Sequence, residues 1–358
     1  MKILQVITSL QIGGAEKLIV DIVPMLQAHG HEVDVLLFDG VDTSFKQQLL
    51  SKGVNIYELG RGKSVYSPSF IFKLLPFLKK YDIVHTHNTA PQLFAAIGSV
   101  VCSVVLVTTE HTTSNRRRDW KWYAWVDRWM YSRYKHVICI SNAAEANLNK
   151  YLVHISATVS TIYNGVNIRN FMEAKPLPQL RVHDQGKCVV VMVAGFRYQK
   201  DQDTLIKAFA HLPKEKYELW LVGDGERRLV LEHLVKECGL QNEVRFLGIR
   251  SDIPSVLKSA DIVVMSSHFE GLSLSSIEGM SVGKPFIASD VDGLHEITEG
   301  YGVLFPHEDS EALAHTIQSL SDDSVYYKQV ADKCLERAKM YDIGRMVDSY
   351  LEVYKNLG

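Results

Sequence analysis

Short apolar runs rich in β-branched residues alternate with amphipathic segments along almost the whole chain. Such runs are typical of buried parallel strands, and the segments between them have the period of covering helices. In the first half of the chain we expect strands at residues 2–8, 32–38, 54–59, 82–87, 104–110, 136–141 and 159–165. In the second half we expect them at residues 188–196, 217–225, 243–248, 261–267, 285–289 and 302–305. This order of elements predicts an α/β fold with two doubly wound parallel sheets.

The break between the two series falls at residues 169–187, which are rich in proline, charge and polar residues. This composition is typical of a linker. A chain of 358 residues is also longer than one hydrophobic core usually supports. We therefore expect a first domain at residues 1–168, a second at residues 188–341, and a final amphipathic helix at residues 342–358.

Composition excludes several classes of protein. With 46% hydrophobic residues, 22% charged residues and a net charge of −2, the chain is typical of globular proteins and has no overall attraction to nucleic acid. Its five cysteines stand singly and indicate reduced thiols, not a disulfide framework or zinc site. The N-terminal apolar run is too short for a signal peptide, and the longest run, residues 93–107, is too short to cross a bilayer. We expect a cytoplasmic protein.

Three turns follow predicted strands, at the sheet edge where doubly wound folds bind ligands. Gly13 and Gly14 open the first helix, and paired glycines allow unusual backbone angles and close approach of a ligand. Asp224 stands between two glycines at the end of another strand. Arg197 and Lys200 occupy a third turn, where two cations can neutralise a diphosphate. Each turn also fits a plain connection or a solvated loop.

Glu270 and Glu278 stand eight positions apart, on either side of small, hydroxyl-rich residues. Ser273 is expected to cap a helix that ends near Gly283. The backbone N–H groups of its first turn would suit phosphate oxygens. Glu278 would then face a ribose diol, and Glu270 a sugar beyond the phosphates. Taken alone, the two carboxylates also fit solvated surface charges.

Three histidines lie at adjacent strand ends. His85 and His87 share one face of a strand, and His111 follows the next strand. No carboxylate spacing completes a metal site around them. Each also fits a buried, hydrogen-bonded histidine, and a functional role is favoured for His111 because it opens a loop at the ligand-binding edge.

Residues 115–135 interleave basic and aromatic side chains at helical spacing. This pattern fits an interfacial helix that contacts a membrane of anionic lipids. The favoured interpretation, however, is a helix on which Trp122, Trp125 and Trp129 pack inward while residues 116–118, all arginines, stay in water.

Taken together, these segments resemble glycosyltransferase family 4, retaining enzymes of the GT-B fold, of the type that assembles bacterial surface polysaccharides. The motifs are GGAEKL, DIVHTH, TEHTT, ISNAAEANL, IYNGVN, QKDQDTLIKAF, LVGDGERR, FLGIRSDI and FEGLSLSSIEGMSVGKPFIASD. The resemblance covers nearly the whole chain, and the E-x7-E pair followed by EGMSVGKP is its most specific part. It implies two Rossmann-like domains that face each other across a cleft, with the final helix crossing back to the first domain.

In such enzymes the second domain holds a nucleotide-sugar donor and the first domain holds the acceptor. The resemblance implies catalytic roles for Glu270, His111 and Lys200. It implies donor binding by Gly13, Gly14, Arg197, Lys200, Asp224, Gly248, Arg250, Gly271, Leu272, Ser273, Leu274 and Glu278. It implies acceptor binding by Glu16, His85 and His87. No metal or other cofactor is implied.

The implied reaction transfers a sugar from a nucleoside diphosphate, a UDP-sugar by the type of motif, with retained anomeric configuration. The acceptor would be a saccharide or lipid-linked, and the leaving phosphate oxygen would accept its proton. Two positions depart from the family pattern. Gly195 stands where many members carry arginine, which makes Arg197 the candidate for that charge, and Asn167 stands where aspartate is more frequent.

Three other functions are weighed against this one. A nucleotide-sugar epimerase of the same architecture would release no free nucleoside diphosphate. A nicotinamide-dependent oxidoreductase would carry GxGxxG, which the GGAE turn does not supply. A non-catalytic, membrane-associated subunit would not need Glu270, Glu278, Lys200 and His111.

Overall fold

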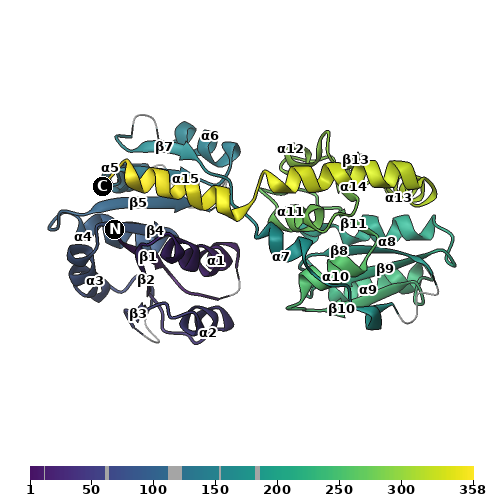
Figure 1. The fold of residues 1–358 in the computed structure, drawn as a ribbon, viewed down its shortest axis with the longest axis horizontal. Helices are drawn as coiled ribbons and strands as arrows, with labels where there is room; N and C mark the ends of the chain where they lie inside the picture. Colours follow the sequence, from purple (N-terminus) through teal and green to yellow (C-terminus); the bar gives the residue numbers. More distant parts are fainter. Residues whose placement is uncertain (12, 61–63, 112–122, 153–154, 182–185) are drawn as a thin grey trace. The chain divides into compact units, whose positions relative to one another are not determined.

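The computed structural model describes residues 1–11, 13–60, 64–111, 123–152, 155–181 and 186–358. They form two compact units: unit 1 comprises Met1–Gly165 and Ile343–Gly358, and unit 2 comprises Val166–Asp342. Each unit contains one parallel sheet with helices between successive strands (Figure 1). All thirteen strands expected from the sequence are present, so the prediction of two doubly wound parallel sheets is confirmed.

The sheet of unit 1 has seven strands in the order β3-β2-β1-β4-β5-β6-β7. The strands are β1 (Lys2–Ile7), β2 (Glu32–Leu37), β3 (Ile56–Glu58), β4 (Ile83–His87), β5 (Val105–Glu110), β6 (His136–Cys139) and β7 (Thr158–Thr161). The helices are α1 (Gly14–Ala28), α2 (Ser44–Ser51), α3 (Ser69–Lys80), α4 (Thr89–Gly98), α5 (Tyr123–Ser132), α6 (Asn142–Tyr151) and α15 (Ile343–Lys355).

The sheet of unit 1 is buried on both faces, as the continuous apolar runs predict. Along β1, Ile3 and Ile7 belong to one buried cluster, and Leu4 and Val6 belong to another. Successive side chains of a strand point to opposite faces, so these clusters are the two cores on either side of the sheet. The long apolar run at residues 93–107 divides into the end of α4 and the start of β5, as expected.

The last helix completes the core of unit 1. Its buried residues recur with helical period and all belong to the same cluster as Ile3: Ile343, Met346, Val347, Tyr350, Leu351 and Tyr354. Figure 1 shows α15, in yellow, lying beside α1 in that unit. The predicted return of the final helix to the first domain is therefore confirmed.

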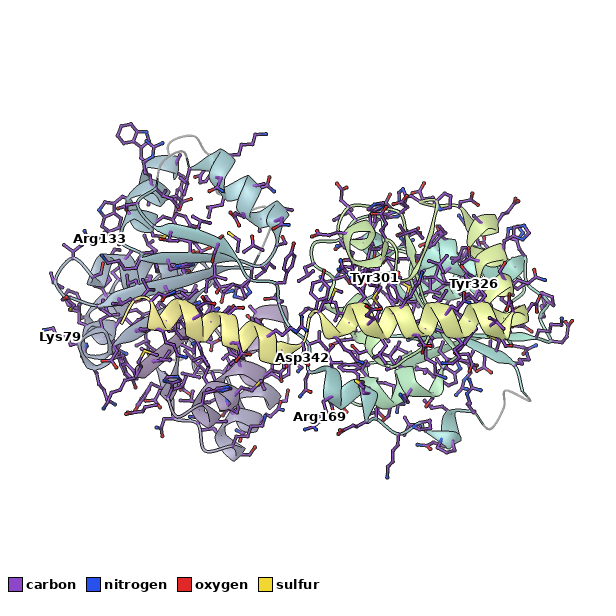
Figure 2. All side chains as sticks on the ribbon, turned by 45° about the horizontal axis from the view of Figure 1, so that its top comes forward. Lys79, Arg133, Arg169, Tyr301, Tyr326 and Asp342 are labelled. Atoms are coloured by element: carbon purple, nitrogen blue, oxygen red, sulfur yellow. The ribbon has the colours of Figure 1, made fainter. Side chains whose placement is uncertain are left out.

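The chain crosses between the units at two adjacent places. Val166 pairs with Asp342, which is labelled in Figure 2 and directly precedes α15. Gly165 is required here, since a Cβ atom at this position would lie 2.5 Å from the Cα of Ile343. Asn167 caps the following helix by accepting a hydrogen bond from the N–H of Asn170 at 3.2 Å. Asparagine thus does at this position what aspartate could do.

The sheet of unit 2 has six strands in the order β10-β9-β8-β11-β12-β13. The strands are β8 (Cys188–Val193), β9 (Tyr217–Val222), β10 (Val244–Gly248), β11 (Ile262–Met265), β12 (Phe286–Ser289) and β13 (Val303–Phe305). The α-helices are α7 (Ile168–Met172), α8 (Gln202–Ala210), α9 (Arg228–Glu237), α10 (Ile253–Ser259), α11 (Leu274–Ser281), α12 (Leu294–Thr298), α13 (Ser310–Asp322) and α14 (Ser324–Lys339). Two short 3₁₀ turns are η2 (Pro178–Leu180) and η3 (Tyr198–Lys200).

Part of the segment expected as a linker packs onto unit 2. The N–H of Leu177 donates to the Ser259 hydroxyl at 2.7 Å, and the Arg181 guanidinium donates to the Ser259 carbonyl at 2.6 Å. The Leu180 carbonyl accepts from Arg245 at 2.7 Å. These bonds attach residues 177–181 to unit 2, which begins at Val166. The five cysteines are free thiols, as predicted.

Candidate functional site

Lys200 and Glu270 form an ion pair at the carboxyl edge of the sheet of unit 2. Lys200 ends the 3₁₀ turn after β8, and Glu270 lies in the loop after β11. The exposed fractions of the two side chains are 21% and 7%. The Ser267 hydroxyl donates a hydrogen bond to the same carboxylate at 2.7 Å. The sequence marks both charged residues as candidates, and the structure places them in contact.

The loop that carries Glu270 is held by its neighbours on both sides. The N–H of His268 donates to the Gln199 carbonyl at 2.8 Å, and the Gln199 side chain donates to the Phe269 carbonyl at 2.9 Å. Gly293 has a φ of 82°, and a Cβ atom there would lie 2.4 Å from the Glu270 carbonyl oxygen. Gly293 therefore lets a second loop approach the site. Sequence reasoning did not identify Ser267, Gln199 or Gly293.

Helix α11 begins directly after this loop. As predicted, Ser273 is its N-cap, accepting from the N–H of Ser276 at 3.3 Å, and the helix ends before Gly283. Within the described part of the chain, the N–H groups of Leu274 and Ser275 have no hydrogen-bond acceptor. Such groups favour an anion, because they carry the positive end of the helix dipole.

The remaining predicted residues of this stretch lie around the start of the same helix. Gly271 is exposed and Leu272 half-buried in the loop that leads into α11. Glu278 is half-buried one turn into α11. The spacing of eight positions therefore places one carboxylate before the helix and the other on it.

Arg197 lies at the start of the same 3₁₀ turn as Lys200 and is exposed. A Cβ atom on Gly195 would lie 3.9 Å from Arg197 Nε. The guanidinium group is therefore next to the place from which a side chain at position 195 would project.

The glycines around Asp224 have a structural explanation. Gly223 has a φ of 133°, and a Cβ atom on it would lie 2.1 Å from the Ala194 carbonyl oxygen. A Cβ atom on Gly225 would lie 2.5 Å from the Phe196 carbonyl oxygen. Two backbone segments thus meet too closely for larger residues. Asp224 itself is exposed, and its carboxylate accepts from the N–H of Gly225 at 2.8 Å.

Gly248 and Arg250 lie at the end of β10. Gly248 has a φ of 68°, which favours glycine. Arg250 donates two hydrogen bonds, at 2.8 and 2.6 Å, to the carboxylate of Asp252. This pairing raises the pKa of Arg250 and lowers that of Asp252. The guanidinium is thereby oriented within its own turn.

The glycine pair of unit 1 differs from the expectation in one respect. Gly13 is the N-cap of α1 with a φ of −167°, extended backbone that any residue adopts, and Gly14 is helical. Unusual backbone angles are therefore not the reason for the pair. The expected close approach of a ligand to the backbone is still compatible with the structure, because Gly14 is exposed and no atom lies within 4 Å of a Cβ atom built on it. Glu16, in the first turn, folds toward Gly13, and burial raises the pKa of its carboxyl group.

Hydrogen bonds join the three predicted histidines, His85, His87 and His111, in one network of unit 1. His85 is fully buried and bonds through Nδ1 to the Tyr354 hydroxyl at 2.5 Å and through Nε2 to the Thr109 hydroxyl at 2.8 Å. His87 is also fully buried, with Nε2 bonded to Gln5 at 2.8 Å and Nδ1 bonded to His111 at 2.8 Å. His85 and His87 are therefore buried, hydrogen-bonded histidines, the alternative to a functional role that the sequence also allowed. Their roles in acceptor binding remain predictions.

Burial keeps these rings neutral and thereby orders their protons. Desolvation lowers the pKa of His85 to about 3 and that of His111 to about 4, and it lowers the pKa of His87 well below its ordinary range. Gln5 donates to Tyr354, so its carbonyl oxygen accepts from His87 Nε2–H. A neutral ring has one N–H, so His87 Nδ1 accepts from His111 Nε2–H. His111 is left with Nδ1 as an acceptor.

Helix α5 covers part of the segment considered for membrane contact. Trp125 is 83% exposed and Trp129 is 41% exposed, so the expectation that these two side chains pack inward is wrong. Trp122 and the arginines at residues 116–118 lie outside the described residues. In the part of the chain that the structure describes, no helix has the length and apolar character to cross a bilayer.

Comparisons with known protein families match both halves of the chain. The model for Glycosyltransferase Family 4 matches residues 12–170, and the model for Glycosyl transferases group 1 matches residues 177–340. UDP-Gal:alpha-D-GlcNAc-diphosphoundecaprenol alpha-1,3-galactosyltransferase of Escherichia coli is 26% identical over 309 residues, 82% of this chain and 79% of that protein. Phosphatidyl-myo-inositol mannosyltransferase of Mycobacterium leprae is 23% identical over 359 residues, 96% of this chain and 93% of that protein.

Solved structures agree with these matches. HepE of Anabaena in complex with UDP is similar with a TM-score of 0.86 and 25% identity, over 99% of this chain and 100% of HepE. Its complex with UDP-glucose gives a TM-score of 0.81 with the same identity and coverage. WaaG, a glycosyltransferase of lipopolysaccharide biosynthesis, shares the fold with a TM-score of 0.70 and 14% identity, over 99% of each chain. The two family models together span nearly the whole sequence, and the chain belongs to glycosyltransferase family 4.

Proposed function

We propose that this glycosyltransferase moves a hexosyl or N-acetylhexosaminyl group from a UDP-sugar to a saccharide or lipid-linked acceptor, with retention of configuration, in cell-surface polysaccharide synthesis. The observation that carries the proposal is the Lys200–Glu270 pair beside the N-terminus of α11. HepE, a structural relative, binds UDP and UDP-glucose. The Escherichia coli relative is named for a UDP-galactose donor and a diphosphoundecaprenol-linked acceptor.

The diphosphate of the donor is proposed to bind where cationic and N–H groups gather in unit 2. Lys200 stabilises the negative charge that develops on the leaving UDP, and the N–H groups of Leu274 and Ser275 bind its oxygens. Arg197 supplies the second positive charge, because its guanidinium lies beside the position where relatives of this family carry arginine, here Gly195. Gly271, Leu272 and Ser273 form the loop around the phosphates.

The two ends of the donor are proposed to bind the two glutamates. Glu278 accepts hydrogen bonds from the ribose diol, and Glu270 accepts them from sugar hydroxyls and orients the sugar. Gly248 and Arg250 face the base, and Asp224 stays a predicted donor contact. In unit 1, Gly13, Gly14 and His111 are expected donor contacts, with His111 Nδ1 as an acceptor. Glu16, His85 and His87 are expected to shape acceptor binding.

In the proposed reaction the bond between the anomeric carbon and the leaving phosphate oxygen breaks, and the acceptor oxygen attacks the same face. The leaving oxygen takes the acceptor's proton, so no protein base is required. UDP and the glycosylated acceptor are the products, and the protein is unchanged.

A donor panel tests the proposal. UDP-sugars should raise the melting temperature of the protein, since a ligand that binds only the folded form stabilises it. Glu278→Gln should abolish the shift and UDP release, and Glu215→Gln, an exposed carboxylate before β9, should leave both intact. Conversion of the donor without UDP release would instead indicate an epimerase. Donor binding without any conversion, unaltered in Glu278→Gln, would indicate a non-catalytic subunit.

A lipid-linked acceptor would bring the enzyme to a membrane, and we propose residues 115–135 as the contact. The exposed Trp125 and Trp129 of α5 support this assignment, since tryptophan prefers the lipid headgroup region. Binding to vesicles that contain anionic lipid should fall in Trp125→Ser. It should not fall in Phe72→Ser, which removes another exposed aromatic side chain from the same unit. Equal binding by both variants would reject the assignment.

A further inference from the structure

Asp201, His268, His307 and Glu308 converge at the carboxyl edge of the sheet of unit 2. Asp201 follows η3, His268 lies in the loop after β11, and the other two form the turn after β13. One ligand atom from each of Asp201, His268 and His307 lies within 4.8 Å of the others. None of these four residues is used by the proposed reaction.

His268 Nδ1 is the centre of this cluster. It lies 2.9 Å from His307 Nε2, 3.3 Å from Glu308 Oε1 and 3.7 Å from Asp201 Oδ2. His307 Nε2 lies 3.9 Å from Glu308 Oε1. A ring nitrogen offers one proton or one lone pair, so it satisfies only one of three such neighbours. A cation that binds the ring nitrogen together with these neighbouring atoms would satisfy more than one of them at once.

The separations fit a metal ion of ordinary size. Zinc binds histidine nitrogen and carboxylate oxygen at about 2.0–2.2 Å, so neighbouring ligands of a tetrahedral site lie about 3.4 Å apart. The separations of His268 Nδ1 from its three neighbours and of His307 from Glu308, from 2.9 to 3.9 Å, lie on both sides of that value, and Asp201 and His307 lie within 4.8 Å of each other.

Asp201 provides an independent observation. The residue is 3% exposed, and its Oδ2 is buried with no hydrogen-bond partner among the described residues, whereas its Oδ1 caps α8 at 3.2 Å from the N–H of Thr204. A buried carboxylate oxygen without a partner is costly. Burial accordingly raises the pKa of this carboxyl group. A cation beside Oδ2 would remove the cost.

We propose that Asp201, His268 and His307, with the Glu308 carboxylate beside the two histidines, bind one divalent transition-metal ion, Zn²⁺, as a structural site in unit 2. The nitrogen and carboxylate ligand set is one that zinc accepts. The ion would tie together the turn that ends in Lys200, the loop that carries Glu270 and the turn after β13. Family resemblance implies no metal in the reaction, and this ion takes no part in it.

The full-length protein, stripped with a chelator and titrated with ZnSO₄, tests the proposal by native mass spectrometry. One Zn²⁺ per chain should bind, and Co²⁺ in its place should give the absorption of a tetrahedral site. His268→Gln and His307→Gln should lower zinc affinity more than about 100-fold, beyond the 10–100-fold loss typical of outer-shell changes. Asp201→Asn, which keeps the capping oxygen, should also weaken binding. His315→Gln removes an exposed histidine of α13 and should bind zinc as the natural protein does.

The chain has fourteen histidines, and others could bind zinc as well. The loss of binding in the His268 and His307 variants, not zinc binding by itself, therefore tests the proposed site. Circular dichroism establishes that each variant is folded, and UDP-induced thermal shifts establish that a loss of zinc is not a loss of the donor site. Zinc binding that is equal in His268→Gln, His307→Gln and the natural protein would overturn the proposal, and so would the lack of stoichiometric binding. In either case the two histidines are a hydrogen-bonded pair only. Neither result depends on the proposed transferase activity.

Discussion

Lys200 and Glu270 each change the electrostatic surroundings of the other, because their charged groups are in contact and largely buried. The pair has no net charge, so it is tolerated in a site from which water is partly excluded. A donor phosphate that approaches Lys200 would compete with Glu270 for the ammonium group. Glu270 would then be available for sugar hydroxyls. In the proposed site, the pairing would thus couple phosphate binding to sugar binding.

Lys200→Met should lower kcat for UDP-sugar turnover about 100- to 1000-fold, because it removes a charge that stabilises the leaving group. UDP release is the measurement, and Lys207→Met, on an exposed position of α8, is the control. The double variant with Glu270→Gln should lose less than the sum of the two single effects, since contacting residues act as a unit. Strict additivity of the two free-energy losses would contradict the coupling.

The buried histidines make the stability of unit 1 depend on pH. Free histidine in the unfolded chain takes up a proton near pH 6.5, whereas burial keeps His85 and His111 neutral down to a pKa of about 3 and about 4. The unfolded state therefore binds more protons as the pH falls from about 6.5 to about 4, and stability falls with it. Above about pH 6.5 their contribution is fully present.

His87→Gln should reduce that pH dependence by at most about 1.4 kcal/mol per pH unit, the value for one proton. Urea unfolding at pH 7 and at pH 5 measures this pH dependence of the free energy of unfolding. Tryptophan fluorescence detects the unfolding of unit 1, since four of the five tryptophans belong to that unit. His29→Gln, an exposed histidine of the same unit, is the control. An unaltered slope in His87→Gln would show that His87 is protonated equally in both states.

At the scale of elements, the start of α11 combines a structural cap with the N–H groups that are proposed to bind the diphosphate. The Ser273 hydroxyl satisfies one N–H of the first turn, which leaves those of Leu274 and Ser275 for a ligand. Helix α6 has the same cap, since the Ser141 hydroxyl accepts from the N–H of Ala144 at 3.2 Å. The two helices therefore offer a matched comparison.

Ser273→Ala and Ser141→Ala should each destabilise the protein by about 1 kcal/mol, the usual cost of a lost serine cap. Only Ser273→Ala should weaken UDP binding, because it loosens the turn whose N–H groups are proposed to hold the diphosphate. Chemical denaturation and calorimetric titration with UDP measure the two effects. Equal losses of UDP affinity in both variants would show that the effect is one of general stability.

At the scale of the whole molecule, unit 1 depends on residues from both ends of the chain. Six buried side chains of α15 join its core, and Tyr354 and Tyr350 reach the histidine network. At about 1.5–3 kcal/mol for each buried apolar side chain, their loss is comparable to the total stability of a domain.

A chain that ends at Asp342 should therefore keep unit 2 folded and lose unit 1. Limited proteolysis followed by mass spectrometry should show protection of residues 166–342 and cleavage throughout residues 1–165. The full-length protein is the control. Protection of residues 1–165 in the shortened chain would show that α15 only adds to a core that is stable without it.

Much of the fold could be predicted because hydrophobic periodicity is a local property of the sequence. All thirteen strands, the Ser273 cap and the amphipathic last helix follow from patterns within about fifteen residues. The candidate residues at strand ends could be proposed because parallel strands present their carboxyl ends at one edge. The prediction that Trp125 and Trp129 pack inward is wrong, because helical period alone does not show which face of a helix meets the core.

The sequence by itself determined the elements, their order and the chemical groups at the strand ends of this protein. Only the tertiary structure decided which of those groups meet: Lys200 with Glu270, and His85 with Tyr354. It also decided why Gly293 and Gly225 must be glycine, since each lies against the backbone of a distant segment. The physical reason is that periodicity and capping act between neighbours in sequence, whereas these contacts join residues that only the topology of the sheets brings together.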